Sequence, residues 1–423
     1  MRAETELAAG RQLLGRFWVA GASSDSAHQA AGVLNWSATD GVVVRLIGPL
    51  VGWPRDLAGA LTVHGETVDG EKLSLIGCRI VSISLGGVAT LTVSGTTLLL
   101  GDHATATTRW RTSVITTANL HEWSGETGLQ VPDSDHAPTG HTTRVQMTWE
   151  VPDTRRVRLP TGELSLSPSM DTKWAIAPEW SIRTGTDVIL KPKRPAKLDV
   201  LYRTGAAPLL SLIVVAGDRP DSITSEVVGD AKSRQRARVL RSGEVVSARE
   251  WRPDNAHLFT AAQLPDFATA VQRWFAISAA TEPALGTFAE AINAGDTYSP
   301  GRFLQVVTAL ESYGRRWRKD KRILLKLLEG LRAYAGLPAR STGCTRRNLK
   351  LIVASRNFHA HLSQPNYGFS LEFVQLTTFE STRRASALMQ ACILRELGFS
   401  ARATRKMLDE HYRNWPIPMS TVD

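Results

Sequence analysis

The stretch Phe267-Ala-Thr-Ala-Val-Gln-Arg-Trp-Phe-Ala-Ile-Ser278 is where the pattern of the chain changes. Its apolar residues recur at intervals of three and four, the spacing of one face of an amphipathic helix. Before this stretch the pattern indicates short strands, and after it successive helices. The sequence therefore predicts an α+β protein of two domains: a β-rich sandwich or barrel over residues 1–255, and a helical bundle over residues 256–423 with its core at about 299–423.

The strands of the first half are predicted from alternating or β-branched segments, separated by glycine turns such as Asp40-Gly41 and Asp69-Gly70. The continuous apolar run Leu209–Val215 predicts a fully buried strand. The clearest other segments are Val42–Ile47, Leu73–Ile80, Ala89–Val93 and Thr143–Trp149.

The helices of the second half are predicted from capping residues and from residues that end a helix. A long helix is expected from about Leu371 to Leu397, where Gly398 ends it. Four other residues precede an apolar helical pattern and are expected to cap a helix: Ser299, Asp320, Thr345 and Ser400.

The positive charge of the chain lies in one segment. The 423 residues carry a formal net charge of +10. Residues 301–361 alone contain 14 Lys and Arg against 3 Asp and Glu, so the rest of the chain is nearly neutral. A basic segment of this kind points to an anionic partner, which could be nucleic acid, a membrane surface or a phosphorylated ligand.

Several other classes are disfavoured by the sequence. It has no G-x-x-x-x-G-K-[ST] phosphate loop, no H-E-x-x-H and no strand-turn-helix G-x-G-x-x-G. The widely spaced Cys78, Cys344 and Cys392 argue against a disulfide framework or a structural zinc site, and they fit a reducing cytoplasm. The start lacks the apolar core of a signal peptide, and the run near Leu209–Val215 is too short to span a membrane. We expect a cytoplasmic protein with no cofactor and no membrane partner.

The best candidate for chemistry is Arg356-Asn-Phe-His-Ala-His361, at the end of a predicted helix inside the basic segment. Metal-free RNA cleavage needs a base for the 2′-hydroxyl, an acid for the leaving 5′-oxygen and a fixed cation for the charge that builds on phosphorus. His361 can move protons near neutral pH, and Arg356 can hold phosphate through its planar fork. Asn357 can orient the substrate or the imidazole.

In a regular helix, only some of these side chains lie on the same face. Asn357 and His361 are four apart and share a face. Arg356 and His361 are five apart, roughly 140° around the helix, so the arginine must bend or a second chain must complete the site. The alternative reading is that these residues only interact with the helix dipole and solvent. His359 is expected to be an ordinary structural histidine.

Two further clusters could carry a function. Asp133, Asp135, His136 and His141 share one loop and could bind a metal ion, although flexible loops of this composition are common and we expect no metal. The other cluster mixes cations with an aromatic ring and could follow an RNA backbone, or could be a solvated helix end with the ring in the core. It consists of Arg315, Arg316, Trp317, Arg318, Lys319 and Arg322.

The motif of Arg356 and His361 resembles the signature of HEPN ribonucleases, in the variant with a polar residue after the arginine. The helix Phe303–Arg315, which carries Glu311, resembles the corresponding helix of ApeA-like HEPN domains, although Gly314 stands where that group often has histidine. The run Gly15-Arg-Phe-Trp-Val, followed by Gly32-Val-Leu-Asn-Trp and the strand at Val42, is similar to the β-rich ApeA N-terminal domain.

The resemblance implies an anti-phage abortive-infection protein, with a sensing N-terminal region and a C-terminal HEPN ribonuclease that cuts tRNA or other RNA without metal. It further implies a homodimer through the helical bundle. Arg356 would hold phosphate, His361 would do acid–base work, Asn357 would support them and Glu311 would orient a basic side chain. A phage protein or ligand would act on the N-terminal domain.

Two alternatives remain open at this stage. In one, the bundle only dimerises or binds RNA, without catalysis. In the other, the β-rich half senses a ligand or carbohydrate, and the helices only oligomerise. The presence of both Arg356 and His361 favours the ribonuclease.

Overall fold

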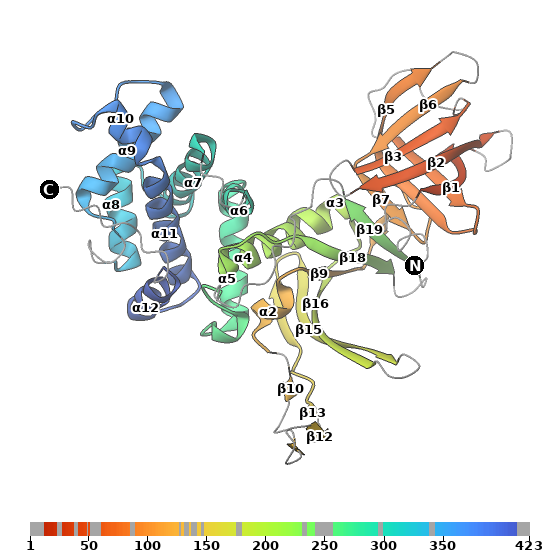
Figure 1. Ribbon diagram of the computed structural model, residues 1–423, viewed down its shortest axis with the longest axis horizontal. Coiled ribbons are helices and arrows are strands. Elements are labelled where there is room, and N and C mark those ends of the chain that lie inside the picture. Colours follow the sequence, from red (N-terminus) through yellow and green to blue (C-terminus); the bar gives the residue numbers. More distant parts are fainter. Residues whose placement is uncertain are drawn as a thin grey trace.

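A barrel lies at one end of the structure, helices lie at the other, and a large antiparallel sheet joins them (Figure 1). This computed structural model confirms the predicted α+β architecture, with a β-rich N-terminal part and a helical C-terminal part. It describes residues 12–22, 28–37, 41–48, 50, 61–84, 89–126, 128–130, 135–136, 142–144, 148–174, 180–230, 235–241, 257–294, 299–337 and 343–412.

The barrel is closed by six strands in the order β5, β4, β1, β2, β3 and β6, with β6 pairing back to β5. Its interior is apolar, and Phe17, Leu34 and Val63 are fully buried there. The segments predicted as strands near 42–47, 73–80 and 89–93 fall in β3, β5 and β6, which confirms them. The bounds are β1 Leu13–Val19, β2 Ala30–Ser37, β3 Gly41–Ile47, β4 Leu61–Thr67, β5 Lys72–Ser84 and β6 Thr90–Gly95.

A glycine makes room for an aromatic ring inside the barrel. Phe17 on β1 pairs with Gly65 on β4. A Cβ atom at Gly65 would lie 2.7 Å from the ring of Phe17 and 2.8 Å from Leu73, closer than side chains pack. The absence of a side chain at Gly65 therefore lets Phe17 fill the space between β1 and β4.

The barrel strands continue into a thirteen-stranded sheet, which passes from β5 through β7, β19, β18, β9, β16 and β15 and ends at β14. Of the strand expected over Thr143–Trp149, only the two ends are among the described residues, and Thr142–Arg144 and Thr148–Trp149 belong to two separate short pairs. The remaining sheet strands are β7 Thr97–Leu100, β9 Thr112–Thr117, β14 Arg155–Leu159, β15 Gly162–Trp174, β16 Trp180–Pro192, β18 Ile223–Asp230 and β19 Gln235–Arg241. The short pairs are β8 Arg109–Trp110 with β17 Ala196–Lys197, β10 Leu129–Gln130 with β13 Thr148–Trp149, and β11 Asp135–His136 with β12 Thr142–Arg144.

The run Leu209–Val215, expected as a strand, is a helix. It lies in α4 (Ala207–Gly217), which continues α3 (Leu198–Leu201) and a π-helical turn η2 (Tyr202–Ala206). Because α4 is buried on nearly all sides, it shows no polar face, and a short apolar run does not distinguish helix from strand. The combined run Leu198–Gly217 is long and apolar enough to cross a membrane, contrary to the sequence-based expectation, but 61% of its most apolar window is buried inside the molecule, as in a core helix.

The helical part begins with α5, and most of its predicted starts are confirmed. Ser299, Thr345 and Ser400 each accept a hydrogen bond from the backbone N–H three residues on, as capping residues do. The bounds are α2 Leu120–Ser124, η3 Ala261–Gln263, α5 Phe267–Thr281, α6 Ala284–Asn293, α7 Pro300–Ser312, η4 Tyr313–Trp317, α8 Leu324–Ala335, α9 Arg346–His361, α10 Leu371–Leu376, α11 Thr378–Glu396 and α12 Ala401–His411.

Two helix predictions are wrong. Asp320 does not cap α8; its carboxylate instead accepts from the backbone N–H and the guanidinium of Arg322, and α8 begins at Leu324. The long helix expected from Leu371 is divided at Thr377, whose hydroxyl donates to the carbonyl of Phe373 at 2.6 Å. Gly398 follows α11 with a φ of +96°, as expected for a residue that ends a helix.

One hydrophobic core joins the far half of the sheet to the helices. It runs from Ile115 and Val157 on the sheet, through Trp274 on α5, to Leu388 on α11. The barrel has a separate core of its own. The predicted division near residue 255 falls within residues 242–256, which lie outside the described residues.

Four segments of the helical part converge on the buried carboxylate of Glu396, which is 1% exposed. The hydroxyls of Tyr313 and Tyr334 each donate to Oε1 at 2.9 Å. Arg273 binds the other oxygen at 2.8–2.9 Å, and Arg318 lies 3.4 Å from Oε1. Burial alone raises the pKa of Glu396, but hydrogen bonds from Tyr334, Tyr313 and Arg273 together outweigh it, so the net shift of its pKa is downward.

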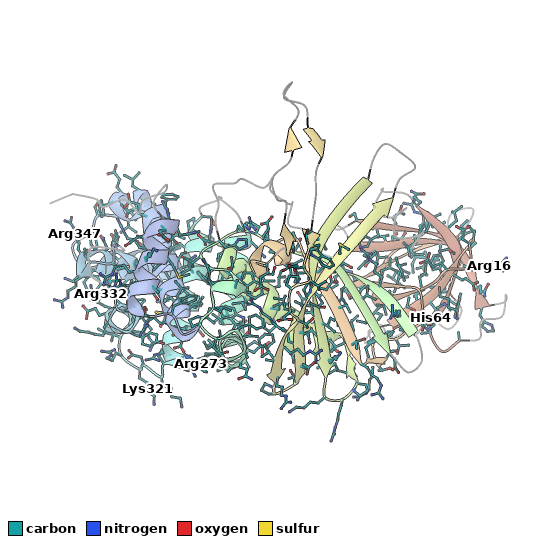
Figure 2. All side chains as sticks on the ribbon, turned by 90° about the horizontal axis from the view of Figure 1, so that it is seen from below. Arg16, His64, Arg273, Lys321, Arg332 and Arg347 are labelled. Carbon is teal, nitrogen blue, oxygen red and sulfur yellow. The ribbon has the colours of Figure 1, made fainter. Side chains whose placement is uncertain are left out.

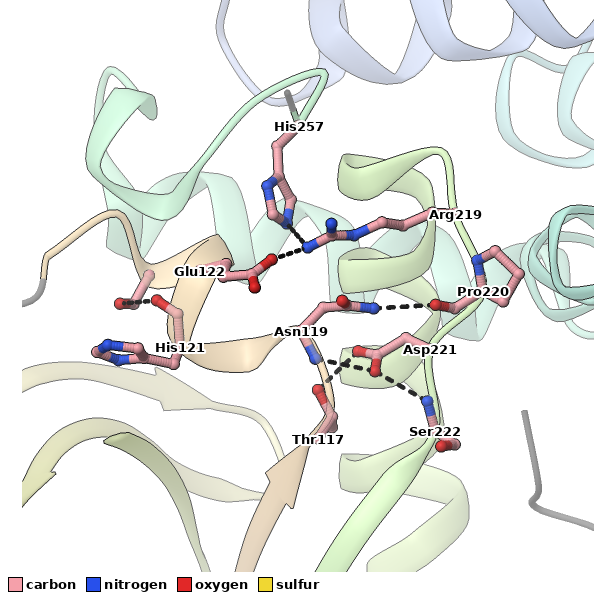
Figure 3. A network of polar contacts seen from close by, with 10 residues as sticks. Thr117, Asn119, His121, Glu122, Arg219, Pro220, Asp221, Ser222 and His257 are labelled. Carbon is pink, nitrogen blue, oxygen red and sulfur yellow. Dashed lines mark hydrogen bonds and ion pairs between the residues drawn. The ribbon is translucent and has the colours of Figure 1, made fainter. Parts of the chain in front are cut away.

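A second polar network joins the sheet to the helices at Asp221 (Figure 3). Its carboxylate accepts from the hydroxyl of Thr117 at 2.6 Å and from the backbone N–H groups of Asn119 and Ser222 at 3.1 and 2.8 Å. Burial raises the pKa of Asp221 to about 6, although these three donors act in the opposite direction. Nearby, burial and the charge of Arg219 lower the pKa of His257 to about 4.

We expect Glu396→Gln to lower the free energy of unfolding by about 3 kcal/mol or more, because it leaves two arginines without their shared carboxylate. Glu410→Gln is the matched control, since Glu410 is half exposed in an ion pair with Lys406 and should change stability by less than about 0.5 kcal/mol. Chemical denaturation measures both. Equal effects of the two substitutions would contradict the role given to Glu396.

The raised pKa of Asp221 should make the stability of the fold depend on pH. Its pKa in the folded state, about 6, lies above its ordinary value, so between pH 4 and 6 the folded state binds the proton more tightly than the unfolded state. Stability from this group is therefore lost as pH rises through that window. Relative to Asp221→Asn, the wild-type free energy of unfolding should fall by about 2 kcal/mol between pH 4 and pH 6. Chemical denaturation at a series of pH values measures this, and Asp199→Asn, at an exposed residue, is the control. If the difference in free energy of unfolding between wild type and Asp221→Asn does not change with pH, the raised pKa of Asp221 is refuted.

Candidate functional site

The candidate residues lie on α9, which is buried on most of its circumference. Leu349 and Ile352 face the main core, and Leu351 and Ala354 face a smaller apolar cluster formed with α10. The helix ends at Leu362, whose φ of +51° turns the chain directly after His361. The candidate pair therefore occupies the last turn of a firmly packed helix.

Arg356 and His361 meet within one chain. The Nη1 atom of Arg356 lies 3.0 Å from Nε2 of His361, and the same Nη1 donates to Oδ1 of Asn357 at 3.3 Å. The flexible arginine side chain thus spans the angle that a regular helix places between positions five apart. A second chain is not required to bring these two groups together.

Glu311 on α7 lies beside Arg356. Its Oε2 is 3.6 Å from Nη2 of Arg356, and its Oε1 accepts from Arg315 at 2.8 Å. The carboxylate therefore pairs with two guanidinium groups at once. Arg356 is 30% exposed and Glu311 is 20% exposed, while His361 is open to solvent. An anionic substrate can reach the imidazole and the outer edge of the guanidinium.

Gly314 leaves no room for a side chain in this structure. A Cβ atom there would lie 2.7–3.0 Å from three side-chain atoms of Leu327 on α8. A histidine at this position, in η4, would require the Leu327 side chain to shift. The site of this chain is therefore built without a group at 314.

The predicted RNA-contacting cluster has exposed cations, most of which contact neighbouring groups, and a partly buried Trp317. Trp317 packs against the core, with Arg273 4.5 Å above its ring. Arg318 reaches the buried Glu396 and lies 3.8 Å from the Tyr334 ring centre. Arg322 pairs with Asp320, Arg315 pairs with Glu311, and Arg316 donates to the carbonyl of Glu282. All five cations of the cluster are exposed, and RNA contact by the cluster stays a prediction.

His359 is a structural residue, as expected. Its ring lies between Phe303 and Phe358, with ring centres at 5.8 and 4.9 Å, and its Nε2 is 3.0 Å from the hydroxyl of Thr378. Burial lowers the pKa of His359, which favours the neutral ring. His359 is therefore separated from the Arg356–His361 pair by both contacts and environment.

The exposed side of α9 carries more polar residues than the sequence reasoning identified. Arg346, Lys350, Asn357 and His361 follow one another at spacings of four, seven and four, so they form one stripe along the helix. Arg346 pairs with Glu329 at 3.1 Å, while Lys350 lies over the ring of Tyr367 at 5.6 Å. The spacing itself was the signal in the sequence that could have found Lys350.

The candidate metal loop is only partly within the described residues. Asp133 and His141 lie outside the described residues, and for Asp135 and His136 only the backbone of β11 is described. Within the part of the chain whose side chains are described, no group of three or more His, Cys, Asp or Glu residues is placed to hold a metal ion.

The fold and the site together define a two-part protein: a β-rich N-terminal region with a closed barrel, followed by a basic helical region with a solvent-accessible Arg–His pair. Lys321, Arg332 and Arg347 of the basic segment lie at the helical end, far from Arg16 and His64 of the barrel (Figure 2). The family model described as ApeA N-terminal domain 1 matches residues 12–274.

Because this match covers more than half of the chain, the chain belongs to the ApeA N-terminal domain 1 family and is an ApeA-like protein. The matched region extends beyond residue 255 to Trp274, so it includes about half of α5. No curated protein and no solved structure matches the chain. Family membership supports a role in anti-phage defence.

We expect His361→Ala to change the free energy of unfolding by less than about 0.5 kcal/mol, because the side chain is exposed. His359→Ala should cost about 1–2 kcal/mol, because it removes contacts with two phenylalanine rings and Thr378. Thermal and urea unfolding of the two variants compare histidines on the same helix. A larger loss for His361→Ala would show that its role is structural.

Proposed function

We propose that this chain is a cytoplasmic anti-phage defence protein whose helical region is a metal-independent HEPN endoribonuclease. The observation that carries the proposal is the 3.0 Å contact between Arg356 and His361 on an exposed helix end within a strongly basic segment. Membership of the ApeA N-terminal domain family supports the defensive role.

The reaction is attack of a ribose 2′-hydroxyl on the adjacent phosphate, which releases the 5′-oxygen of the next nucleotide and leaves a cyclic phosphate. His361 transfers protons, since imidazole acts as acid or base near neutral pH. Arg356 donates hydrogen bonds to the phosphoryl oxygens and stabilises the charge that builds there. Asn357 and Glu311 hold the guanidinium in place for this task.

A homodimer is part of the proposal. The reaction needs both a base and an acid, whereas among the described residues of one chain only the imidazole of His361 contacts Arg356. Leu362, directly after His361, is 83% exposed, and Leu376 at the end of α10 is 74% exposed. Exposed apolar side chains next to a reactive pair fit a surface that a second copy covers.

The substrate proposed is host RNA, with tRNA as the first candidate, and cleavage would halt growth of the infected cell. The N-terminal domain would respond to a phage protein or a ligand and release the nuclease. The separate core of the barrel supports an independent sensing role for that part of the chain.

We expect Arg356→Ala and His361→Ala each to lower the rate of tRNA cleavage by about 10²–10⁴-fold, the usual contribution of an acid–base group. Purified full-length protein, tRNA and denaturing gels measure this, and a chelator should leave the wild-type rate unchanged. Arg405→Ala is the matched control, since Arg405 is exposed on α12, away from α9 (Figure 1).

Unchanged cleavage in His361→Ala would show that the proposed site is wrong. Strong inhibition of the wild type by the chelator would indicate a metal-dependent nuclease. Binding of RNA without any cleavage would favour the non-catalytic RNA-binding reading of the helical region.

A further inference from the structure

The loop that follows His361 holds an exposed tyrosine in an uncommon backbone conformation. Tyr367 has a φ of +61°, followed by Gly368 at +78°, and its side chain is 43% exposed. Residues other than glycine rarely adopt this left-handed region, because the side chain meets its own backbone. Such strain at an exposed aromatic residue points to a role outside packing.

The packing of the loop does not depend on Tyr367. Phe369 and Phe373 stack with ring centres 5.8 Å apart and planes 11° apart, and both pack against the cluster of Leu351, Ala354 and Val374. Tyr367 is outside that cluster. The loop is thus anchored by Phe369, while the ring two residues earlier is left on the surface.

Lys350 places a positive charge near the ring of Tyr367. Its Nζ atom lies 5.6 Å from the centre of the Tyr367 ring, and among the described residues no acidic side chain pairs with it. Lys350 lies seven residues before Asn357 on the exposed stripe of α9, about 10 Å along the helix axis. Lys350 is thus on the helix that carries the Arg356–His361 pair, about 9 Å before Arg356 along its axis.

We propose that Lys350 and Tyr367 form a nucleotide-binding subsite for single-stranded RNA, in which a nucleobase stacks on Tyr367 and Lys350 binds a backbone phosphate close to the one that Arg356 holds. This rests on the proposed ribonuclease function. A tyrosine face accepts any base, and a lysine binds phosphate as a point charge, so the subsite fixes the path of the strand with little sequence preference.

The test is the affinity of the full-length protein for a fluorescent, single-stranded 2′-O-methyl RNA, which cannot be cut because its 2′-oxygen is blocked. Tyr367→Ala should weaken binding by about tenfold, and Tyr367→Phe should keep wild-type affinity because it keeps the stacking face. Lys350→Ala should reduce the slope of log K against log salt by about 1, whereas Tyr367→Ala should leave that slope unchanged. Lys406→Ala, at a lysine 75% exposed on α12, is the control.

In cleavage of unmodified RNA, Tyr367→Ala should raise KM with a small change in kcat, since it removes binding and leaves the reacting groups in place. If the wild type cleaves RNA but Tyr367→Ala binds and cleaves it equally well, the subsite is refuted and the ribonuclease stands. Equal loss of affinity in Tyr367→Phe and Tyr367→Ala would also refute stacking. If the wild type neither binds nor cleaves RNA, the proposed function and the subsite both fail.

Discussion

The buried carboxylate of Glu396 is the interaction on which the arrangement of the helical part depends. One side chain on α11 receives hydrogen bonds from α5, η4 and α8, so it fixes three segments against a fourth. Removing a single charge from water is costly unless partners replace the solvent, and here two tyrosines and two arginines do so. The position of η4 then fixes the end of α7, where Glu311 contacts Arg356. The geometry at the candidate site is thus linked to a carboxylate that never touches it.

Much of the helical part could be predicted from local signals. Three helices are capped as their sequences predict, because a hydroxyl at the start of a helix can accept a hydrogen bond from a backbone N–H that has no partner within the helix. The capping residues are Ser299, Thr345 and Ser400. Asp320 had the same local appearance, but the guanidinium of Arg322 was a stronger partner than the backbone of α8. Leu209–Val215 could not be assigned, because a helix buried on all sides has the same apolar pattern as a buried strand.

At the candidate site, too, the sequence predicted which residues lie together but not how their side chains are directed. The sequence identified Arg356, Asn357, His361 and Glu311, and all four lie together. What it could not supply was the direction of long side chains: Arg356 folds toward His361, and Arg318 contacts the buried Glu396. The sequence also gave no sign that Lys350 faces the aromatic ring of Tyr367.

The closure of the barrel has a consequence for how the sheet ends. A sheet normally has two edges whose free backbone groups can pair with another chain, but here one end is closed by the pairing of β6 with β5. The other end is β14, whose sequence Arg-Arg-Val-Arg-Leu is rich in charge and packs beside α5. There the amide of Gln272 donates to the carbonyl of Arg158, and the guanidinium of Arg155 donates to the carbonyl of Ala261. A sheet of this size is thus kept from adding further strands and from aggregating through its edges.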